Sequence, residues 1–255
     1  MAGLWVQETG AEAGPDDAPL VVFVHGSLDR AASFSKVVRR LRDLHTVVYD
    51  RRGYAGSHDV GPPFTVASQV DDLLFVMQER PAVVVGHSYG GNVALAAAQA
   101  RPDLVRAVVV FEAPMPWADW WPPTSGGYAI VKQSRADDDP ADISERFMRR
   151  MIGDERWERL PAATRESRRA EGPALVGEIT DLGRTAPYDV DAIVVPVVTA
   201  RGENGAAHHR QSTELLFSTL ANPTMVTINE AGHGAHTTHP DEFAAIVRLA
   251  VATGG

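Results

Sequence analysis

The 255-residue chain contains no cysteine. A disulfide framework, a thiolate metal site and a cysteine nucleophile are therefore excluded, and any metal ligands must be histidine, aspartate or glutamate. Basic residues are not in excess either, because 24 Lys and Arg stand against 33 Asp and Glu, giving a net charge of −9. This acidic balance argues against a phosphate backbone as a partner, so no nucleic acid is expected.

Long hydrophobic runs are also missing. Apolar stretches such as Val83–Val85 and Val108–Phe111 have the length of strands, far short of the roughly 20 residues that a membrane-spanning helix needs. The first twenty residues lack the basic start and the unbroken apolar segment of a secretory signal. We therefore expect a soluble cytoplasmic protein with no membrane contact. Hydrophobic residues make up 44% and charged residues 22%, as in ordinary globular chains, and the length allows one large domain with an insert.

Short Val-rich runs alternate with helix-compatible segments along the chain. The predicted strands are Leu20–Val24, Thr46–Tyr49, Ala82–Val85, Ala107–Phe111, Ala192–Thr199 and Thr224–Asn229. The predicted helices are Phe34–Leu44, Val66–Glu79, Asn92–Ala100, about Gln211–Leu220 and Pro240–Val251. Continuous rather than alternating hydrophobicity indicates strands that are buried on both faces. The order of elements predicts an α/β fold with a parallel sheet covered on both sides.

The character of the sequence changes after Ala113. Pro114–Pro123 holds three of the five tryptophans and four prolines, which a buried central strand could not carry. From Ser134 to about Asp181 the chain is charged, with apolar residues at helical spacing. We expect an α/β body made of residues 1–115 and 186–255, interrupted by a helical insert at 116–185.

The most specific motif is Gly86–Gly91, with the sequence GHSYGG, between a predicted strand and a predicted helix. It matches the G-x-S-x-G pattern, in which a sharp strand-to-helix turn exposes the serine oxygen while the glycines allow close approach. Ser88 is therefore the candidate nucleophile.

A serine nucleophile needs donors for a developing oxyanion. The amide of Tyr89, directly after the serine, and the amide of Ser27, in the loop after the strand Leu20–Val24, are the candidates. His25 in the same loop is expected to brace it by hydrogen bonding, since a triad needs only one base.

The base must come from nine histidines, and His233 has the best position, between the last predicted strand and the last helix. His236 and His239 follow at three-residue spacing, which also occurs in metal sites. The glycines around His233, the lack of a fixed carboxylate companion and Pro240 argue against that reading, so no metal and no cofactor are expected. His208 and His209 are expected to face solvent.

The chain resembles the α/β-hydrolase superfamily over nearly its whole length. Four motifs occur in the order typical of that family: His25-Gly26, the turn Asp50–Ser57, the Ser88 motif and Gly232-His233. The resemblance implies the α/β-hydrolase fold, with a mostly parallel eight-stranded sheet flanked by helices. It also implies a helical cap after the strand that follows the serine strand, here residues 116–185. In the family the Asp50–Ser57 turn is structural.

The acid departs from the common family pattern. Most similar members carry an aspartate after the strand that precedes the penultimate helix, but here Val197–Thr199 is followed by ARGENG, with glycine at the expected position. Glu203 lies one or two residues early. Glu112 is the alternative, since some members place the acid at the end of the equivalent strand, and a carboxylate there lies beside the catalytic crevice. We favour Glu112 and keep Glu203 open.

Dehalogenases and epoxide hydrolases of this fold would use an aspartate nucleophile, so the serine predicts acyl transfer instead. The favoured small-molecule substrate is a small to medium apolar ester, thioester or lactone. A carbon–carbon hydrolase or a cofactor-free haloperoxidase or perhydrolase would use the same triad, and a non-catalytic receptor is the alternative of another class. The sequence makes no prediction of oligomeric state. Residues expected to form an apolar wall over the serine, or else to pin the cap, are Met115, Trp117, Trp120 and Trp121.

Overall fold

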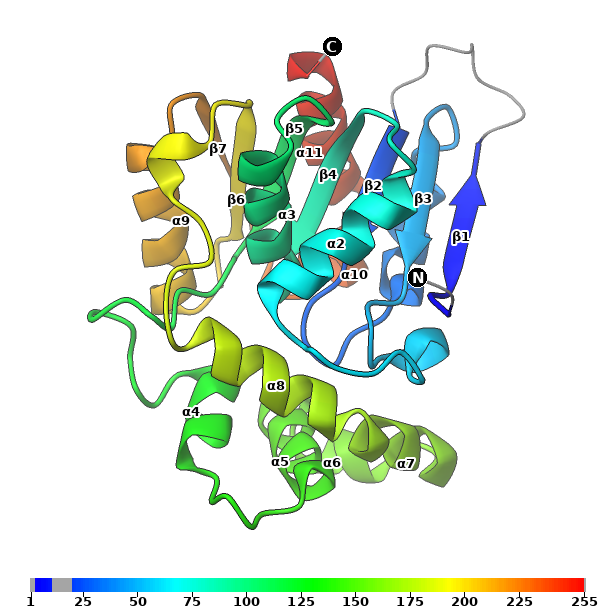
Figure 1. The fold of residues 1–255 in the computed structure, drawn as a ribbon, viewed down its shortest axis with the longest axis vertical. Coiled ribbons are helices and arrows are strands. Elements are labelled where there is room, and N and C mark those ends of the chain that lie inside the picture. The colour runs from blue at the N-terminus through cyan, green and yellow to red at the C-terminus, as the bar shows by residue number, and fades with distance from the viewer. Residues whose placement is uncertain (1–2, 11–19, 255) are drawn as a thin grey trace.

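The computed structural model describes residues 3–10 and 20–254, and within them one seven-stranded sheet forms the centre of the molecule (Figure 1). The strand order is β1-β3-β2-β4-β5-β6-β7, with β1 antiparallel to β3 and all other neighbouring pairs parallel. The strands are β1 (Val6–Thr9), β2 (Leu20–Val24), β3 (His45–Tyr49), β4 (Ala82–His87), β5 (Val105–Phe111), β6 (Val197–Gly202) and β7 (Pro223–Ile228).

Helices cover both faces of the sheet (Figure 1). Alternate residues of each central strand enter two separate cores, so that Val22 and Val24 pack under one layer while Val21 and Phe23 pack under the other. One layer consists of α2 (Val66–Met77), α3 (Tyr89–Ala100) and α9 (Ala207–Thr219). The opposite layer consists of η1 (Ala31–Phe34), α1 (Ser35–Val38), α10 (Ala235–Thr238) and α11 (Pro240–Thr253). Burial on both faces explains the continuous hydrophobicity of these strands.

Strand register brings four chain segments together at one edge of the sheet. Val24 of β2 pairs with Gly86 of β4, and His87 pairs with Phe111 of β5. Phe111 in turn pairs with Ala200 of β6. The loops that follow β2, β4, β5 and β6 therefore start side by side, at the carboxyl ends of parallel strands.

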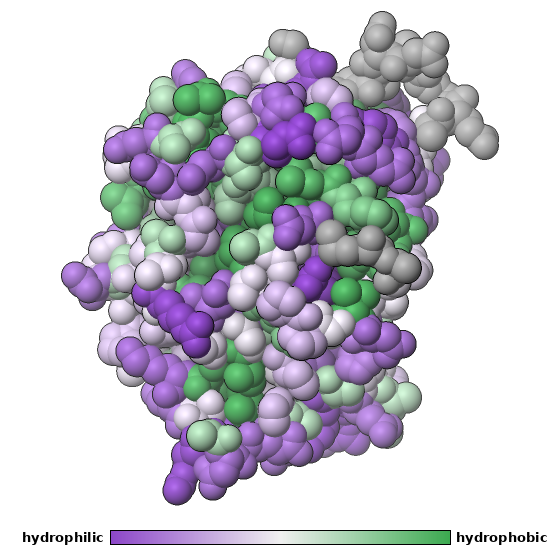
Figure 2. Space-filling model, in the orientation of Figure 1, coloured by the Kyte–Doolittle hydropathy of each residue, from purple (hydrophilic) through white to green (hydrophobic). Residues whose placement is uncertain are grey.

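Five helices are inserted between β5 and β6 and lie together at this end of the sheet (Figure 1). Their shared core is centred on Phe147, Trp157 and Leu175. Acidic and basic side chains pair on the outer surface, as Arg169 does with Asp142, and hydrophilic residues predominate along this end of the molecule (Figure 2). The helices are α4 (Gly126–Gln133), α5 (Pro140–Ile152), α6 (Asp154–Glu158), α7 (Ala162–Ala170) and α8 (Gly172–Leu182).

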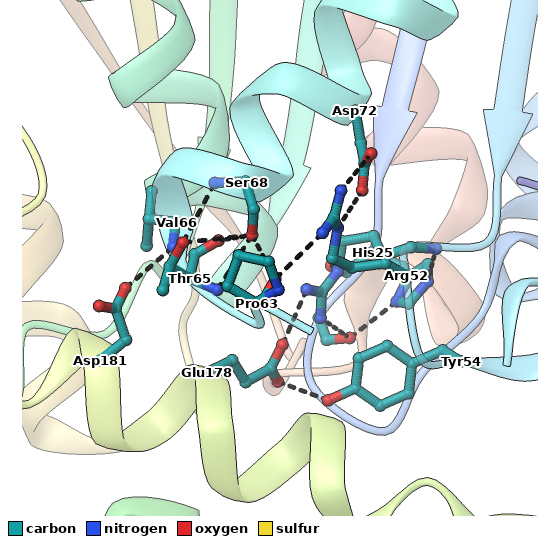
Figure 3. Close-up of polar contacts among 12 residues, drawn as sticks. His25, Arg52, Tyr54, Pro63, Thr65, Val66, Ser68, Asp72, Glu178 and Asp181 are labelled. Atoms are coloured by element: carbon teal, nitrogen blue, oxygen red, sulfur yellow. Dashed lines mark hydrogen bonds and ion pairs between the residues drawn. The ribbon is translucent and has the colours of Figure 1, made fainter. Parts of the chain in front are cut away.

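Buried ionic contacts tie α8 to the sheet (Figure 3). One Glu178 oxygen accepts from the Arg51 guanidinium at 2.8 Å, and the other accepts from the Tyr54 hydroxyl at 2.7 Å. Asp181 accepts from the Val66 N–H at the start of α2. The Arg51 and Glu178 side chains are fully buried, and loss of one partner from such a pair costs about 3–5 kcal/mol. The turn at 50–57, with its short helix η2 (Ala55–Ser57), thus holds the insert in place.

The described residues contain seven strands, so the eighth strand that the resemblance implied is not confirmed. Two other expectations need correction. The strand expected at Ala192–Thr199 begins only at Val197, because η3 (Val190–Ala192) and Pro196 precede it, and proline has no N–H for the ladder. The helix expected at Phe34–Leu44 is only the short pair η1 and α1, followed by turns.

Candidate active site

Ser88 lies between β4 and α3 in a strained conformation, with φ of 54° and ψ of −123°. A positive φ in a residue other than glycine costs of order 1–3 kcal/mol and persists only where the surroundings enforce it. The Ser88 N–H donates to the Phe111 carbonyl at 2.9 Å, which ties the turn to β5. This is the sharp strand-to-helix turn that the motif predicts.

Two glycines make the turn possible. A Cβ on Gly86 would lie 2.3 Å from the Gly90 carbonyl oxygen, and one on Gly90 would lie 2.1 Å from the Val24 carbonyl oxygen. Neither position has room for a side chain, so α3 can pack directly against the ends of β2 and β4.

The loop after β2 lies against the serine. A Cβ on Gly26 would lie 3.0 Å from the Ser88 Cβ. His25 Nε2 accepts from the Arg51 N–H at 2.9 Å, and its Nδ1 lies 2.8 Å from the Gly26 carbonyl oxygen. Burial, followed by the charge of Arg51, lowers the pKa of His25 to about 3. His25 is therefore a neutral brace of the loop, as the sequence predicts, and has no place as a base.

His233 contacts Glu112, the carboxylate that the sequence analysis favours. His233 Nδ1 lies 2.6 Å from Glu112 Oε2, while Glu112 Oε1 accepts from the Gly202 N–H at 2.9 Å. The Glu112 side chain is fully buried, and its φ of 50° is again unusual for a residue other than glycine. A short bond from a buried carboxylate fixes which ring nitrogen of His233 carries hydrogen and leaves Nε2 free.

Glu203, the alternative acid, is engaged elsewhere. Its side chain is exposed and accepts from the Glu230 N–H at 2.9 Å. The Glu203 N–H itself donates to the Ile228 carbonyl, which keeps this residue on the outer side of the β6–β7 edge. Of the two carboxylates, only Glu112 contacts His233 in the described part of the chain.

A cavity of about 440 Å³ opens between the sheet edge and the insert, and Ser88, His233, Ser27 and Tyr89 all line it. The insert contributes an apolar side. Its residues in the wall include Phe147, Met148, Met151, Ile152, Leu160, Ile179 and Leu182.

The sequence left open whether four residues form an apolar wall over the serine or pin the cap. Trp121 lines the cavity, but Met115, Trp117 and Trp120 are not among the described residues of the wall. Met115 is buried in the core of the body, and Trp117 packs edge-on against Tyr188. After β5 the chain runs along the body before it reaches α4. The side chains in this segment therefore pack on the body and fix the start of the insert.

The expectation that His208 and His209 face solvent is wrong. Both line the cavity, where the His209 ring stacks on the His233 ring with centroids 4.6 Å apart and an interplanar angle of 15°. Burial, followed by the charge of His233, lowers the pKa of His209 well below its usual range. The contact forms because the first turn of α9 comes soon after β6 and therefore starts at the same edge of the sheet as Ser88. The local sequence around His209 carries no sign of this position.

His87, directly before the serine, is a second neutral imidazole beside His233. The ring centroids are 4.7 Å apart, and His87 Nε2 donates to the His233 carbonyl oxygen at 2.8 Å. Burial lowers the pKa of His87 well below its usual range, and the nearby His236 and His233 act in the same direction.

The geometry agrees with comparison to known families. A model of the alpha/beta hydrolase family matches residues 21–246, which is most of the chain. The chain belongs to the alpha/beta hydrolase family. Solved hydrolases of this fold superpose over almost the full length: an esterase from Thermogutta terrifontis (TM-score 0.75, 20% identity, 98% of this chain and 93% of that one) and an enol-lactonase from Burkholderia xenovorans LB400 (TM-score 0.74, 19% identity, 98% and 96%).

Sequence relatives among curated hydrolases match over a shorter segment. Lipase LipV of Mycobacterium tuberculosis is 31% identical over 102 residues, 39% of each chain. The 2-(acetamidomethylene)succinate hydrolase of Mesorhizobium japonicum is 34% identical over 98 residues, 37% of this chain and 35% of that one. The match thus spans less than two fifths of the length of these relatives. Among the described residues, no helix is long and apolar enough to cross a membrane.

Proposed function

We propose that this alpha/beta hydrolase is a serine hydrolase that cleaves a small to medium, largely apolar ester, thioester or lactone. The observation that carries the proposal is the 2.6 Å contact between His233 Nδ1 and the buried Glu112 carboxylate, on a histidine that shares a cavity with Ser88. A strained serine, a histidine and a buried carboxylate are the parts of a Ser-His-acid triad.

In this mechanism His233 Nε2 removes the Ser88 Oγ proton as Oγ attacks the substrate carbonyl carbon. Glu112 stabilises the imidazolium that forms. The amides of Ser27 and Tyr89 hold the oxyanion, and Tyr89 contributes in addition as the first residue of α3, where free N–H groups favour negative charge. His233 then protonates the leaving alcohol, and a water that it deprotonates cleaves the acyl-enzyme to release the acid.

The insert acts in this proposal as a cap over the serine, spanning residues 116–185. Its apolar wall, with Phe147, Met148 and Ile179, favours substrates with an apolar acyl or alcohol part. The cavity of about 440 Å³ suits a small molecule rather than a polymer. Relatives described as a lipase and structural neighbours described as an esterase and an enol-lactonase act within this range of substrates.

Turnover of short-chain p-nitrophenyl esters and covalent labelling by a fluorophosphonate test the proposal together. We expect saturable hydrolysis, a mass increase of one phosphonyl group per chain, and loss of both in Ser88→Ala. Labelling located on Ser88 by peptide mass spectrometry completes the test. Neither turnover nor labelling of the folded protein would favour a ligand-binding receptor instead.

A further inference from the structure

A second polar cluster lies in the same cavity, outside the proposed triad. It consists of Asp29 after β2, His87 at the end of β4 and His236 in α10. One ligand atom from each residue lies within 4.8 Å of the other two. All three line the cavity, and the two imidazoles are almost fully buried, with ring centroids 4.2 Å apart.

The hydrogen-bond partner of His87 orients its free nitrogen. Nε2 donates to a backbone carbonyl oxygen, which can only accept, so the hydrogen of this ring is on Nε2. Nδ1 is buried and has no hydrogen-bond partner in the described part of the chain. Metal-binding histidines characteristically hold one nitrogen in this way against a carbonyl or carboxylate while the other binds the ion.

Asp29 and His236 complete the cluster without satisfying each other. His236 Nε2 lies 3.6 Å from Asp29 Oδ2, beyond a good hydrogen bond. Oδ2 also accepts from the Ser33 hydroxyl at 2.9 Å, which holds the carboxylate in place. His236 Nδ1 is buried and has no hydrogen-bond partner among the described residues. Buried polar atoms that lack partners carry a cost, and an ion bound to His87 Nδ1 would remove that cost for His87.

We propose that Asp29, His87 and His236 bind a divalent transition-metal ion such as Zn²⁺. Two imidazoles and one carboxylate are three protein ligands of the kind that zinc prefers, with a fourth position left open to the cavity. Zinc–ligand distances are about 2.0–2.2 Å, so the ligand atoms, now within 4.8 Å of one another, must move closer together when the ion binds. Sequence spacing pointed instead to His239, whose Nδ1 contacts the Thr238 hydroxyl.

One other group has a similar composition: Glu112, which is buried behind the cavity wall, with His209 and His233, which line the cavity. Both Glu112 oxygens already accept hydrogen bonds, from the Gly202 N–H and from His233. An ion there would have to break these bonds, whereas the Asp29 cluster presents nitrogens that are free. The Asp29 cluster is therefore the site we assign.

Metal binding also has a consequence that rests on the proposed hydrolase function. His87 precedes Ser88, and the open position of the ion faces the cavity that the substrate would occupy. Ion and substrate then compete for the same space, so Zn²⁺ raises the apparent KM for the ester.

Titration calorimetry with zinc chloride, on the untagged full chain after treatment with a chelator, measures the binding. We expect one ion per chain. Asp29→Asn and His236→Gln, which keep side-chain size, should each weaken binding by about tenfold or more. His209→Gln is the matched control, because it removes one member of the competing group and should leave the affinity unchanged. Circular dichroism without metal checks that each variant is folded.

Absence of binding to the parent protein, equal affinity in the Asp29 and His236 variants, or loss of binding in His209→Gln overturns the assignment. Anomalous diffraction from a zinc-soaked crystal decides it without any variant: the ion lies between His87 and His236, or the proposal is wrong. No ester is present in these measurements, so failure of the proposed hydrolase function would leave them valid.

Discussion

Replacement of Glu112 by glutamine is the sharpest perturbation of the proposed triad. In the parent protein the carboxylate accepts from both the Gly202 N–H and His233 Nδ1. A glutamine has one acceptor oxygen, so its NH₂ group must face either a buried N–H donor or the imidazole nitrogen. In the second case His233 changes tautomer and its Nε2 carries the hydrogen, which removes the base from Ser88. We expect kcat for a p-nitrophenyl ester to fall by about 10³–10⁴, equivalent to about 4–5.5 kcal/mol in the activation barrier.

Glu203→Gln is the control, because Glu203 contacts the Glu230 N–H and not His233. It should retain nearly the parent kcat. Thermal unfolding of both variants separates a catalytic effect from loss of fold, since an unpaired buried donor costs only about 1–3 kcal/mol. If the folded Glu112→Gln variant kept more than about a tenth of the parent kcat, or Glu203→Gln lost activity instead, the assignment of the acid would be refuted.

Three further perturbations test the surroundings. Gly205→Ala should lower kcat about 10²-fold in steady-state assays with little change in fold, because its Cβ would lie 2.2 Å from Glu112 Oε1; unchanged kcat would contradict this. Glu178→Gln should lower stability by about 3–5 kcal/mol and Tm by about 10 °C, while the exposed Glu166→Gln leaves Tm unchanged. The pKa of His25, lowered to about 3 by burial and Arg51, means that the unfolded chain binds a proton below about pH 6.5 before the folded one does. Stability is therefore lost as pH falls from 6.5 towards 3, by about 2 kcal/mol for this residue between pH 6.5 and 5; urea midpoints that do not fall over that interval would refute this.

Strands that are buried on both faces could be predicted from the sequence, since only an apolar run can fill two cores at once. Leu20–Val24 was predicted to the residue for this reason. β1 escaped prediction because Val6–Thr9 lies mostly exposed at the sheet edge and carries no such run. The observed start of a strand differs from the predicted one where a local feature opposes the hydrophobic pattern. Pro196 is such a feature, and β6 begins only after it.

The histidines of the cavity could not be assigned from their local sequence. His208 and His209 lie just before the helix predicted at about Gln211–Leu220, next to polar residues, and this local sequence indicates exposure. In the structure both are half-buried, and Trp121, from a segment almost ninety residues earlier, packs with its ring centroid 4.6 Å from that of His208. Their position could have been predicted from the order of the strands rather than from hydrophobic periodicity, because residues just after parallel strands meet at one edge of the sheet.

The same topology accounts for the position of Glu112, the proposed acid. β5 and β6 are neighbours in the sheet, with Phe111 paired to Ala200. A carboxylate that follows either strand therefore starts near the loop after β7, which carries His233. At Gly205, where a side chain after β6 would enter this space, the Glu112 carboxylate already fills it. The Glu112 side chain after β5 therefore fits only because the loop after β6 has a glycine at position 205. Exchange of the acid between these strands would require both positions to change together, because either change alone leaves His233 without a partner or forces two groups into one volume.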